Sequence, residues 1–203
     1  LGQLISNMAT ALVMIPIAGS VALELGISPV PLVMCVAVAS AAALLTHERI
    51  DSTDRVDNEA GHWVMPLSNG RTREINDEHA KPGMLTLAQA IEVSSNVVMA
   101  KLSDRLTPVE QYQQLRDFGF GAPTGVELPS ESRGIVYRPE RWQPEYDRVS
   151  VAMGYYFEVT ALQLAAAYAA IANDGVLLTP TLIREVRAPD GTLRGYAVQR
   201  TAP

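Results

Sequence analysis

Apolar residues fill the first 46 positions of the chain almost without interruption, whereas apolar and polar residues are mixed from His47 onward. Glu24 is the only charged residue before His47. Two apolar runs, ISNMATALVMIPIAGSVAL (residues 5–23) and PVPLVMCVAVASAAALL (residues 29–45), are joined by a turn rich in Gly and Pro. Two helix-length apolar runs on either side of such a turn predict a helical hairpin.

Each of the two runs is close to the length of roughly 17 residues that a helix needs to cross a bilayer. A hairpin inserted in a membrane explains this pattern, and so does a hairpin buried in the core of a soluble domain. A cleavable signal peptide does not fit, because no Lys or Arg precedes the first run and there are two runs. Residues 1–45 are therefore a candidate membrane contact, with the buried hairpin as the alternative.

The segment HWVMPLSNGRTREIND (residues 62–77) places Asn69-Gly70 between short alternating stretches, which predicts a β-hairpin. A helix is expected to begin after Thr86 as N-cap. It is interrupted by Ser-Ser-Asn at residues 94–96 and continues as VVMAKLSDRL to Leu106.

Two more helices follow the interrupted one. Thr107-Pro108 caps and opens PVEQYQQLRDFGF, which we expect to stop at Gly119. Thr160 is the predicted N-cap of VTALQLAAAYAAIANDG. A long loop (residues 121–146) is predicted between these helices. Near the end of the chain, two short strands are predicted around the turn at residues 190–191.

Composition and charge exclude several classes of function. A net charge of −6 and a pI near 5.1 lack the excess of positive charge that is typical of nucleic-acid-binding proteins. Cys35, the one cysteine, lies in an apolar run and is expected to be a small buried hydrophobe. His47, His62 and His79 have no metal-ligand spacing, so neither a metal nor a cofactor is predicted.

Four ordered blocks in the second half of the chain resemble the transpeptidase domain of class B penicillin-binding proteins, the septal cell-division type in particular. The blocks are GMLTLAQAIEVSSNVVMAKLSDRL (83–106), YQQLRDFGFGAPTGVELPSESRG (112–134), RW (141–142) and VTALQLAAAYAAIANDGVLLTPTLI (159–183). The resemblance runs over about residues 42–201. It implies a mixed α/β fold of the α+β type, in which helices pack on an antiparallel sheet that is incomplete in this chain.

A second resemblance covers the apolar half. The stretch LISNMATALVMIPIAGSVALELGISPVPLVMCVAVASAA resembles a segment of divalent-anion and arsenite type membrane transporters, whose Ser-Asn-Thr or Ser-Asn-Asn signature opens a broken, substrate-binding helix. Ser6, Asn7 and Met8 stand at the matching positions, and Met8 departs from the pattern. We therefore divide the chain into a transporter-like apolar hairpin (residues 1–41) and a partial transpeptidase domain (residues 42–203).

The transpeptidase resemblance implies three motifs around one cleft: Ser-x-x-Lys with the nucleophile, Ser-x-Asn, and Lys-Thr-Gly. Ser94 and Asn96 match the second motif and are the candidate catalytic and substrate-binding residues. The resemblance gives Ser94 a proton relay toward the leaving amine and Asn96 a hydrogen bond to the stem peptide. The alternative is that both side chains only bond nearby backbone at a helix junction. Gly154 also matches and is a candidate substrate-binding residue, whereas Tyr156 stands where the family usually has glycine.

The other two motifs are absent from the sequence. No serine is followed three positions later by either of the two lysines, Lys81 and Lys101, and no Lys-Thr-Gly occurs. Spacing places the Ser-x-x-Lys near Val33–Val36, which reads VMCV, and the Lys-Thr-Gly strand beyond Pro203. Although the family consists of serine acyl-transferases, this chain is therefore expected to be inactive by itself.

Three hypotheses about function follow. The chain is a fragment of a peptidoglycan D,D-transpeptidase that cross-links the cell wall during septum formation, a noncatalytic module that binds stem peptide, or a remnant of a membrane anion transporter. The transpeptidase resemblance implies peptidoglycan stem peptide or a β-lactam as ligand and cell-division proteins as candidate partners. It also implies a location at the bacterial inner membrane, with the domain on the periplasmic, extracytoplasmic side.

Overall fold

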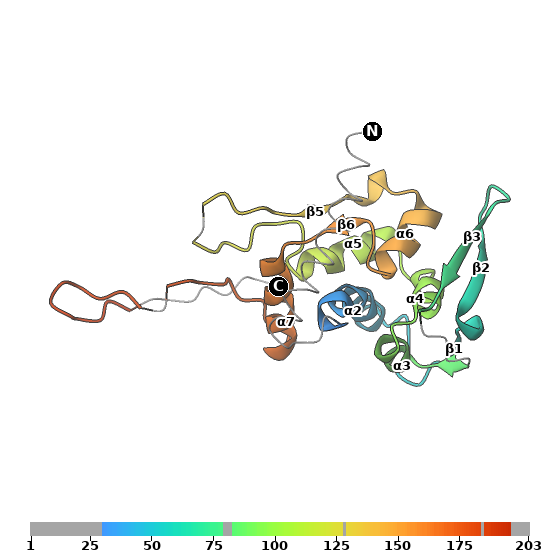
Figure 1. Cartoon of the computed structure of the whole chain (residues 1–203), viewed down its shortest axis with the longest axis horizontal. Helices are drawn as coiled ribbons and strands as arrows, with labels where there is room; N and C mark the ends of the chain where they lie inside the picture. Colours follow the sequence, from blue (N-terminus) through green and yellow to red (C-terminus); the bar gives the residue numbers. More distant parts are fainter. Residues whose placement is uncertain (1–29, 79–82, 128, 184, 196–203) are drawn as a thin grey trace.

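Helix α2 (Val30–Thr46) lies at the centre of the protein and contacts all five of the helices α3 to α7 (Figure 1). The computed structural model describes residues 30–78, 83–127, 129–183 and 185–195. The predicted first apolar run, with Ser6, Asn7 and Met8, lies outside the described residues, whereas the second run forms α2.

The helices around α2 are short. They are α3 (Leu87–Glu92), α4 (Asn96–Ser103), α5 (Pro108–Asp117), α6 (Pro144–Ala152) and α7 (Ala161–Ala172), with two 3-10 turns, η1 (Glu59–Gly61) and η2 (Pro139–Arg141). The strands are β1 (Val56–Asp57), β2 (His62–Pro66), β3 (Thr72–Asn76), β4 (Met84–Leu85), β5 (Ile135–Val136) and β6 (Phe157–Glu158). Within the described ranges the strands form three antiparallel pairs, β1–β4, β2–β3 and β5–β6. Helices with short antiparallel strands confirm the predicted α+β class.

The predicted hairpin is confirmed as β2–β3. Leu67 N–H donates to the Arg71 carbonyl, Gly70 N–H donates to the Leu67 carbonyl, and Gly70 has φ +76°. This geometry fits a three-residue loop that ends in a left-handed glycine, which explains why the sequence needs Gly there. The buried side chains of Met65 and Ile75 project from one face of the hairpin and pack against α4 and α6.

The predicted helix starts are also confirmed. Thr86, Thr107 and Thr160 are the N-caps of α3, α5 and α7, and each forms a reciprocal capping box with the Gln or Glu three residues later. The C-terminal turn forms as predicted, since Gly191 N–H donates to the Ala188 carbonyl, but the two predicted strands are reduced to one antiparallel bridge between Arg187 and Leu193 in the described residues.

Helix α6 was not predicted, and the expected loop at residues 121–146 in fact contains β5, η2 and the start of α6. The inward face of α6 mixes apolar Val149 and Val151 with buried Asp147 and Ser150. Asp147 accepts a hydrogen bond from the Gln143 backbone N–H at 2.7 Å, and this bond explains how a carboxylate is buried at the helix start. Because these polar residues lie on the buried face, the sequence lacks the regular spacing of apolar residues that predicts an amphipathic helix.

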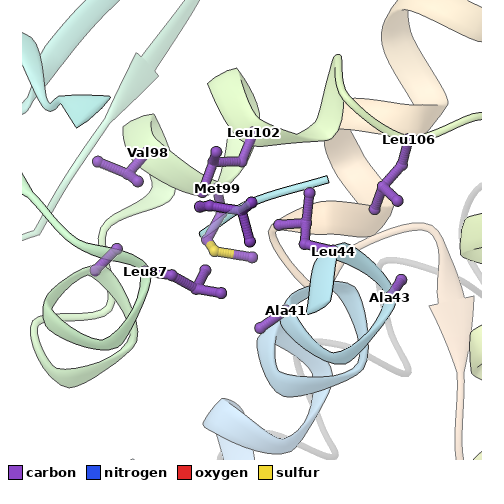
Figure 2. Packing of buried hydrophobic residues seen from close by; sticks show 10 residues of the cluster. Ala41, Ala43, Leu44, Leu87, Val98, Met99, Leu102 and Leu106 are labelled. Carbon is purple, nitrogen blue, oxygen red and sulfur yellow. The ribbon is translucent and has the colours of Figure 1, made fainter. Parts of the chain in front are cut away.

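Helix α2 supplies side chains to the core of the domain. Ala41, Ala43 and Leu44 pack with Leu87, Val98, Met99, Leu102 and Leu106 in one buried cluster (Figure 2). Ala39 belongs to a second cluster, with Phe120, Trp142 and Leu164 among its members. The sequence left two environments open for this run, a membrane and the core of the domain. From Ala39 to Leu44, α2 is packed in the core. In the described part of the chain, no helix combines the length and apolar character needed to cross a bilayer.

Candidate functional site

The break between α3 and α4 is built by two serines with different backbone conformations. Ser94 has φ +54°, in the left-handed region, which ends α3 after Val93. Ser95 returns to an extended conformation and is the N-cap of α4, where its Oγ accepts the Val98 N–H at 3.2 Å. The Ser95 N–H donates to the Ala90 carbonyl at 2.8 Å. The predicted interruption of the helix is confirmed, and it turns the chain within two residues.

The end of strand β3 holds this turn in place. Ser95 Oγ donates to Asp77 Oδ2 at 2.7 Å, and Val97 N–H donates to Asp77 Oδ1 at 2.9 Å. Asn96 Nδ2 donates to the Asn76 carbonyl at 3.0 Å. A carboxylate at the N-terminus of α4 also interacts favourably with the helix dipole. Asp77 was not among the predicted site residues, because no sequence signal connects it to a turn 18 positions later.

Ser94 and Asn96 meet at one small cavity. It measures about 60 Å³ and is lined by Ala37 from α2, by Met153 just after α6, and by Ala90, Ile91, Ser94, Ser95, Asn96 and Met99. Such a volume holds a few water molecules at most, whereas ligand pockets measure roughly 300–1,000 Å³. The structure thus brings the two predicted residues together opposite α2, with Ala37 on the facing wall.

The cavity is lined by two serine hydroxyls and one side-chain amide but, in the described part of the chain, by no general base. Its lining contains no titratable acid, histidine or lysine among the described residues. Lys101, the only lysine in the described ranges, is on α4 but does not line the cavity. Its Nζ lies 2.6 Å from Glu59 Oε1 and 2.8 Å from the Asp57 carbonyl oxygen. Ser94 therefore has no base among the described lining residues to activate it, and the hydroxyl of Ser95 is committed to Asp77 Oδ2 as part of the turn.

Gly154, the third predicted site residue, does not line this cavity. It has φ +92° and follows α6, whose end it closes by donating its N–H to the Val151 carbonyl. Tyr156 has φ +73°, so a non-glycine side chain occupies a backbone conformation that favours glycine. The Tyr156 ring lies 5.3 Å from that of Tyr137, and burial together with the nearby Asp147 carboxylate raises the pKa of Tyr156.

A buried glutamine fixes the loop that precedes β5. Gln163 is 1% exposed, and its Nε2 donates to the carbonyls of Ala122 (2.6 Å) and Arg133 (2.9 Å). Glu131 closes the same loop by accepting hydrogen bonds from Thr124 and Gly125. Burial raises the pKa of Glu131, but these bonds outweigh it and the net pKa is lowered. Within the described ranges, no three His, Cys, Asp or Glu side chains are grouped so that they could hold a metal ion.

The sequence and the structure resemble known proteins. The family model described as penicillin binding protein transpeptidase domain matches residues 36–202. Penicillin-binding protein PbpB of Mycobacterium tuberculosis is 42% identical over 99 residues, which cover 49% of this chain and 14% of that protein. A probable peptidoglycan D,D-transpeptidase, PenA of Neisseria flavescens, is 31% identical over 150 residues, or 74% of this chain and 35% of PenA.

Among solved structures, penicillin binding protein 3 from Mycobacterium tuberculosis complexed with ampicillin superposes with a TM-score of 0.69 at 31% identity. The superposition covers 81% of this chain and 35% of that structure. The chain therefore spans about a third or less of the length of these relatives.

Proposed function

This chain belongs to the penicillin-binding protein transpeptidase family, and from that membership we propose that it is a fragment of a peptidoglycan D,D-transpeptidase of the septal, class B type. The observation that carries the proposal is the joint placement of Ser94 and Asn96 at a helix break opposite α2, within a chain matched by the family model over residues 36–202. In the complete enzyme the donor would be a D-Ala-D-Ala stem peptide, and a β-lactam would react in its place.

We infer that the 203-residue chain is catalytically inactive by itself. Acyl transfer in this family begins with attack by the serine of Ser-x-x-Lys, activated by the neighbouring lysine. The sequence contains no such pair, and positions 33–36 read Val-Met-Cys-Val. Loss of a nucleophile from a cooperative catalytic set costs on the order of a millionfold in kcat. Ser94 cannot take over this role, because no base lines its cavity in the described part of the chain.

A noncatalytic module that binds stem peptide is the second candidate. The favourable observation is that the Ser-x-Asn turn leaves polar groups for a ligand: Ser94 is exposed, and Asn96 uses only its Nδ2 group in a described hydrogen bond. The Asn96 side-chain carbonyl is then available to accept an amide N–H from a peptide. The small volume of the cavity argues against tight binding unless the walls move apart.

We extend the proposal to location and domain organisation. A chain that acts on peptidoglycan would work on the periplasmic, extracytoplasmic side of the bacterial inner membrane, near cell-division proteins. The division predicted from the sequence, an apolar segment (1–41) and a partial transpeptidase domain (42–203), stays a prediction, and α2 crosses this boundary with Ala39 and Ala41 packed in the core of the domain. A spheroplast accessibility assay would test the first point: protease added outside should cleave a tag placed after Pro203.

The test of inactivity uses a fluorescent penicillin. The purified chain is incubated with the reagent, denatured and measured by intact-mass spectrometry, beside a catalytically complete penicillin-binding protein as positive control. We expect no acyl adduct on the chain and a full adduct on the control. A stoichiometric adduct on a chain shown to be folded by circular dichroism would refute inactivity and identify an unexpected nucleophile.

The binding candidate is tested separately by calorimetry with a D-Ala-D-Ala stem peptide. Asn96→Ala should abolish binding, whereas Asn173→Ala should leave it unchanged. Asn173 is a matched control because it also donates one side-chain hydrogen bond to a backbone carbonyl, that of Val176. Equal binding by both variants, or no binding by the parent chain, would exclude the binding module.

A further inference from the structure

Four arginines line one cavity that lies apart from Ser94 and Asn96. Helix α5 contributes Tyr112 and Arg116, and the rest comes from Gly121 and the segment that holds β5 and η2. We call it the arginine cavity; its lining is Tyr112, Arg116, Gly121, Arg133, Gly134, Ile135, Val136, Tyr137, Arg138 and Arg141. Its volume of about 640 Å³ is in the range of small-molecule sites.

The positive charge of this cavity is concentrated and uncompensated. The chain carries a net charge of −6 with only 16 basic residues, and four of them line this one cavity. No acidic side chain is part of the lining among the described residues. In the same part of the chain, the side chains of Arg133, Arg138 and Arg141 form no ion pair and no hydrogen bond. Guanidinium groups gathered without counter-charge favour an anionic ligand.

The floor of the cavity depends on a glycine. Gly121 has φ +78°, and a Cβ at this position would lie 2.7 Å from Arg116 Nη1 and 3.0 Å from the Val136 side chain. The missing side chain therefore leaves the space that the Arg116 guanidinium occupies. Arg116 is fixed there by donating from Nη1 to the Phe120 carbonyl at 2.8 Å.

The wall that carries the other three arginines is anchored at both ends. Gln163 holds the Arg133 carbonyl at 2.9 Å, and the Nε1–H of buried Trp142 donates to the Tyr137 carbonyl at 3.0 Å. Strand β5 is also paired with β6 between these anchors. The backbone of the site is thus ordered before any ligand arrives, so little backbone conformational entropy is lost on binding.

We propose that the arginine cavity binds the phosphate groups of a small ligand. Guanidinium groups match phosphate oxygens with two parallel hydrogen bonds. A phosphate monoester carries about −1.5 to −2 charges at pH 7, so two phosphate groups balance four arginines, whereas a single carboxylate does not. The rings of Tyr112 and Tyr137 in the lining provide contact area for the body of the ligand.

The direct test is calorimetric titration of the full 203-residue chain with inorganic pyrophosphate. The double variant Arg138→Gln with Arg141→Gln should weaken binding by about tenfold or more, since each change removes a charged hydrogen-bond donor. The matched control is Arg71→Gln with Arg194→Gln, which removes the same charge from exposed positions outside the cavity. The control should bind like the parent chain. No binding of pyrophosphate, or an equal loss in both double variants, would overturn the proposal.

Two further experiments distinguish a lipid headgroup from a soluble phosphorylated ligand. Flotation with phosphatidylcholine vesicles, with and without phosphatidylglycerol, tests a lipid headgroup. Arginine-dependent binding to the anionic vesicles that pyrophosphate displaces would assign the site to a lipid, and pyrophosphate binding alone would assign it to a soluble phosphorylated ligand. If oligoglutamate binds through the same arginines and pyrophosphate does not, the site takes an acidic peptide and the phosphate assignment is wrong.

Discussion

Asp77 is the residue on which the geometry of the candidate site depends most directly. One carboxylate oxygen accepts the Ser95 hydroxyl and the other accepts the Val97 N–H. These bonds position the two residues on either side of Asn96. Ser94, next to them, has a left-handed backbone that costs a non-glycine residue about 1–2 kcal/mol. The contacts of Asp77 therefore stabilise a turn that the local sequence disfavours.

Replacing Asp77 tests this dependence. Asp77→Ala should lower the free energy of unfolding by about 1–3 kcal/mol, because it leaves the Val97 N–H and the Ser95 hydroxyl without their partner. Urea denaturation measures the change. Asp117→Ala is the control, since Asp117 accepts one exposed side-chain bond from Gln113 and should cost about 0.5 kcal/mol or less. Equal losses in the two variants would mean that the Asp77 contacts add little to stability.

At the scale of the elements, the start of α5 is joined to the segment that follows α2 by one carboxylate. Glu110 accepts the Thr107 N–H in the capping box and also the Arg49 guanidinium, each at 2.7 Å. The Arg49 hydrogen bond, followed by the Thr107 N–H, lowers the pKa of Glu110 from 4.5 to about 2. The charged form is thus favoured in the folded state, and protonation of Glu110 weakens the Arg49 contact first, because that contact is the largest cause of the lowered pKa.

This shift predicts an acid-dependent loss of stability. Because the folded pKa of Glu110 is depressed, its contribution is complete above about pH 4.5 and is lost as the pH falls toward 2. Glu110→Gln should therefore lower stability near neutral pH and flatten the fall in melting temperature between pH 5 and 2. Thermal denaturation across this interval measures both effects, and parallel curves for parent and variant would show that Glu110 does not carry the acid dependence.

Elements set by local chemistry could be predicted from the sequence. The threonine caps and the Asn69-Gly70 hairpin depend on residues within four positions of one another, so their signals are complete in the local sequence. The break at Ser94 was also predicted from the local Ser-Ser-Asn, although the contacts that stabilise it come from Asp77. Helix α6 and the role of Asp77 could not be found in this way, because buried polar Asp147 and Ser150 obscure the apolar face of α6 and the partner of Asp77 comes from a distant strand.

At the scale of the whole molecule, α2 joins the separate clusters of the core. Ala39 packs in the cluster that includes Phe120 and Trp142, whereas Leu44 packs in the cluster of α3 and α4. The small alanine side chains on α2 let the neighbouring helices pack close to its backbone. The residue pattern predicted an apolar helix here, but its central position follows from contacts far apart in the chain.

Two adjacent leucines test this central role. Leu44 is 1% exposed and Leu45 is 53% exposed. Leu44→Ala should cost about 2–5 kcal/mol of unfolding free energy, because it removes buried surface and leaves a cavity. That loss is a large part of the roughly 5–15 kcal/mol of a typical domain. Leu45→Ala should cost about 0.5 kcal/mol, measured by the same urea titration, and similar losses at both positions would place α2 outside the core.

The central position of α2 also determines when the domain can fold during synthesis. Helix α2 ends at Thr46, whereas α7, which contacts it, begins only at Ala161. A ribosome that adds about 5–20 residues per second needs on the order of ten seconds to make the intervening chain. Until α7 is made, α2 lacks part of the apolar cover that it has in the finished domain, and exposed apolar segments of this kind are what general chaperones bind. The contacts that stabilise the folded domain therefore also make its folding during synthesis depend on chaperones that cover α2.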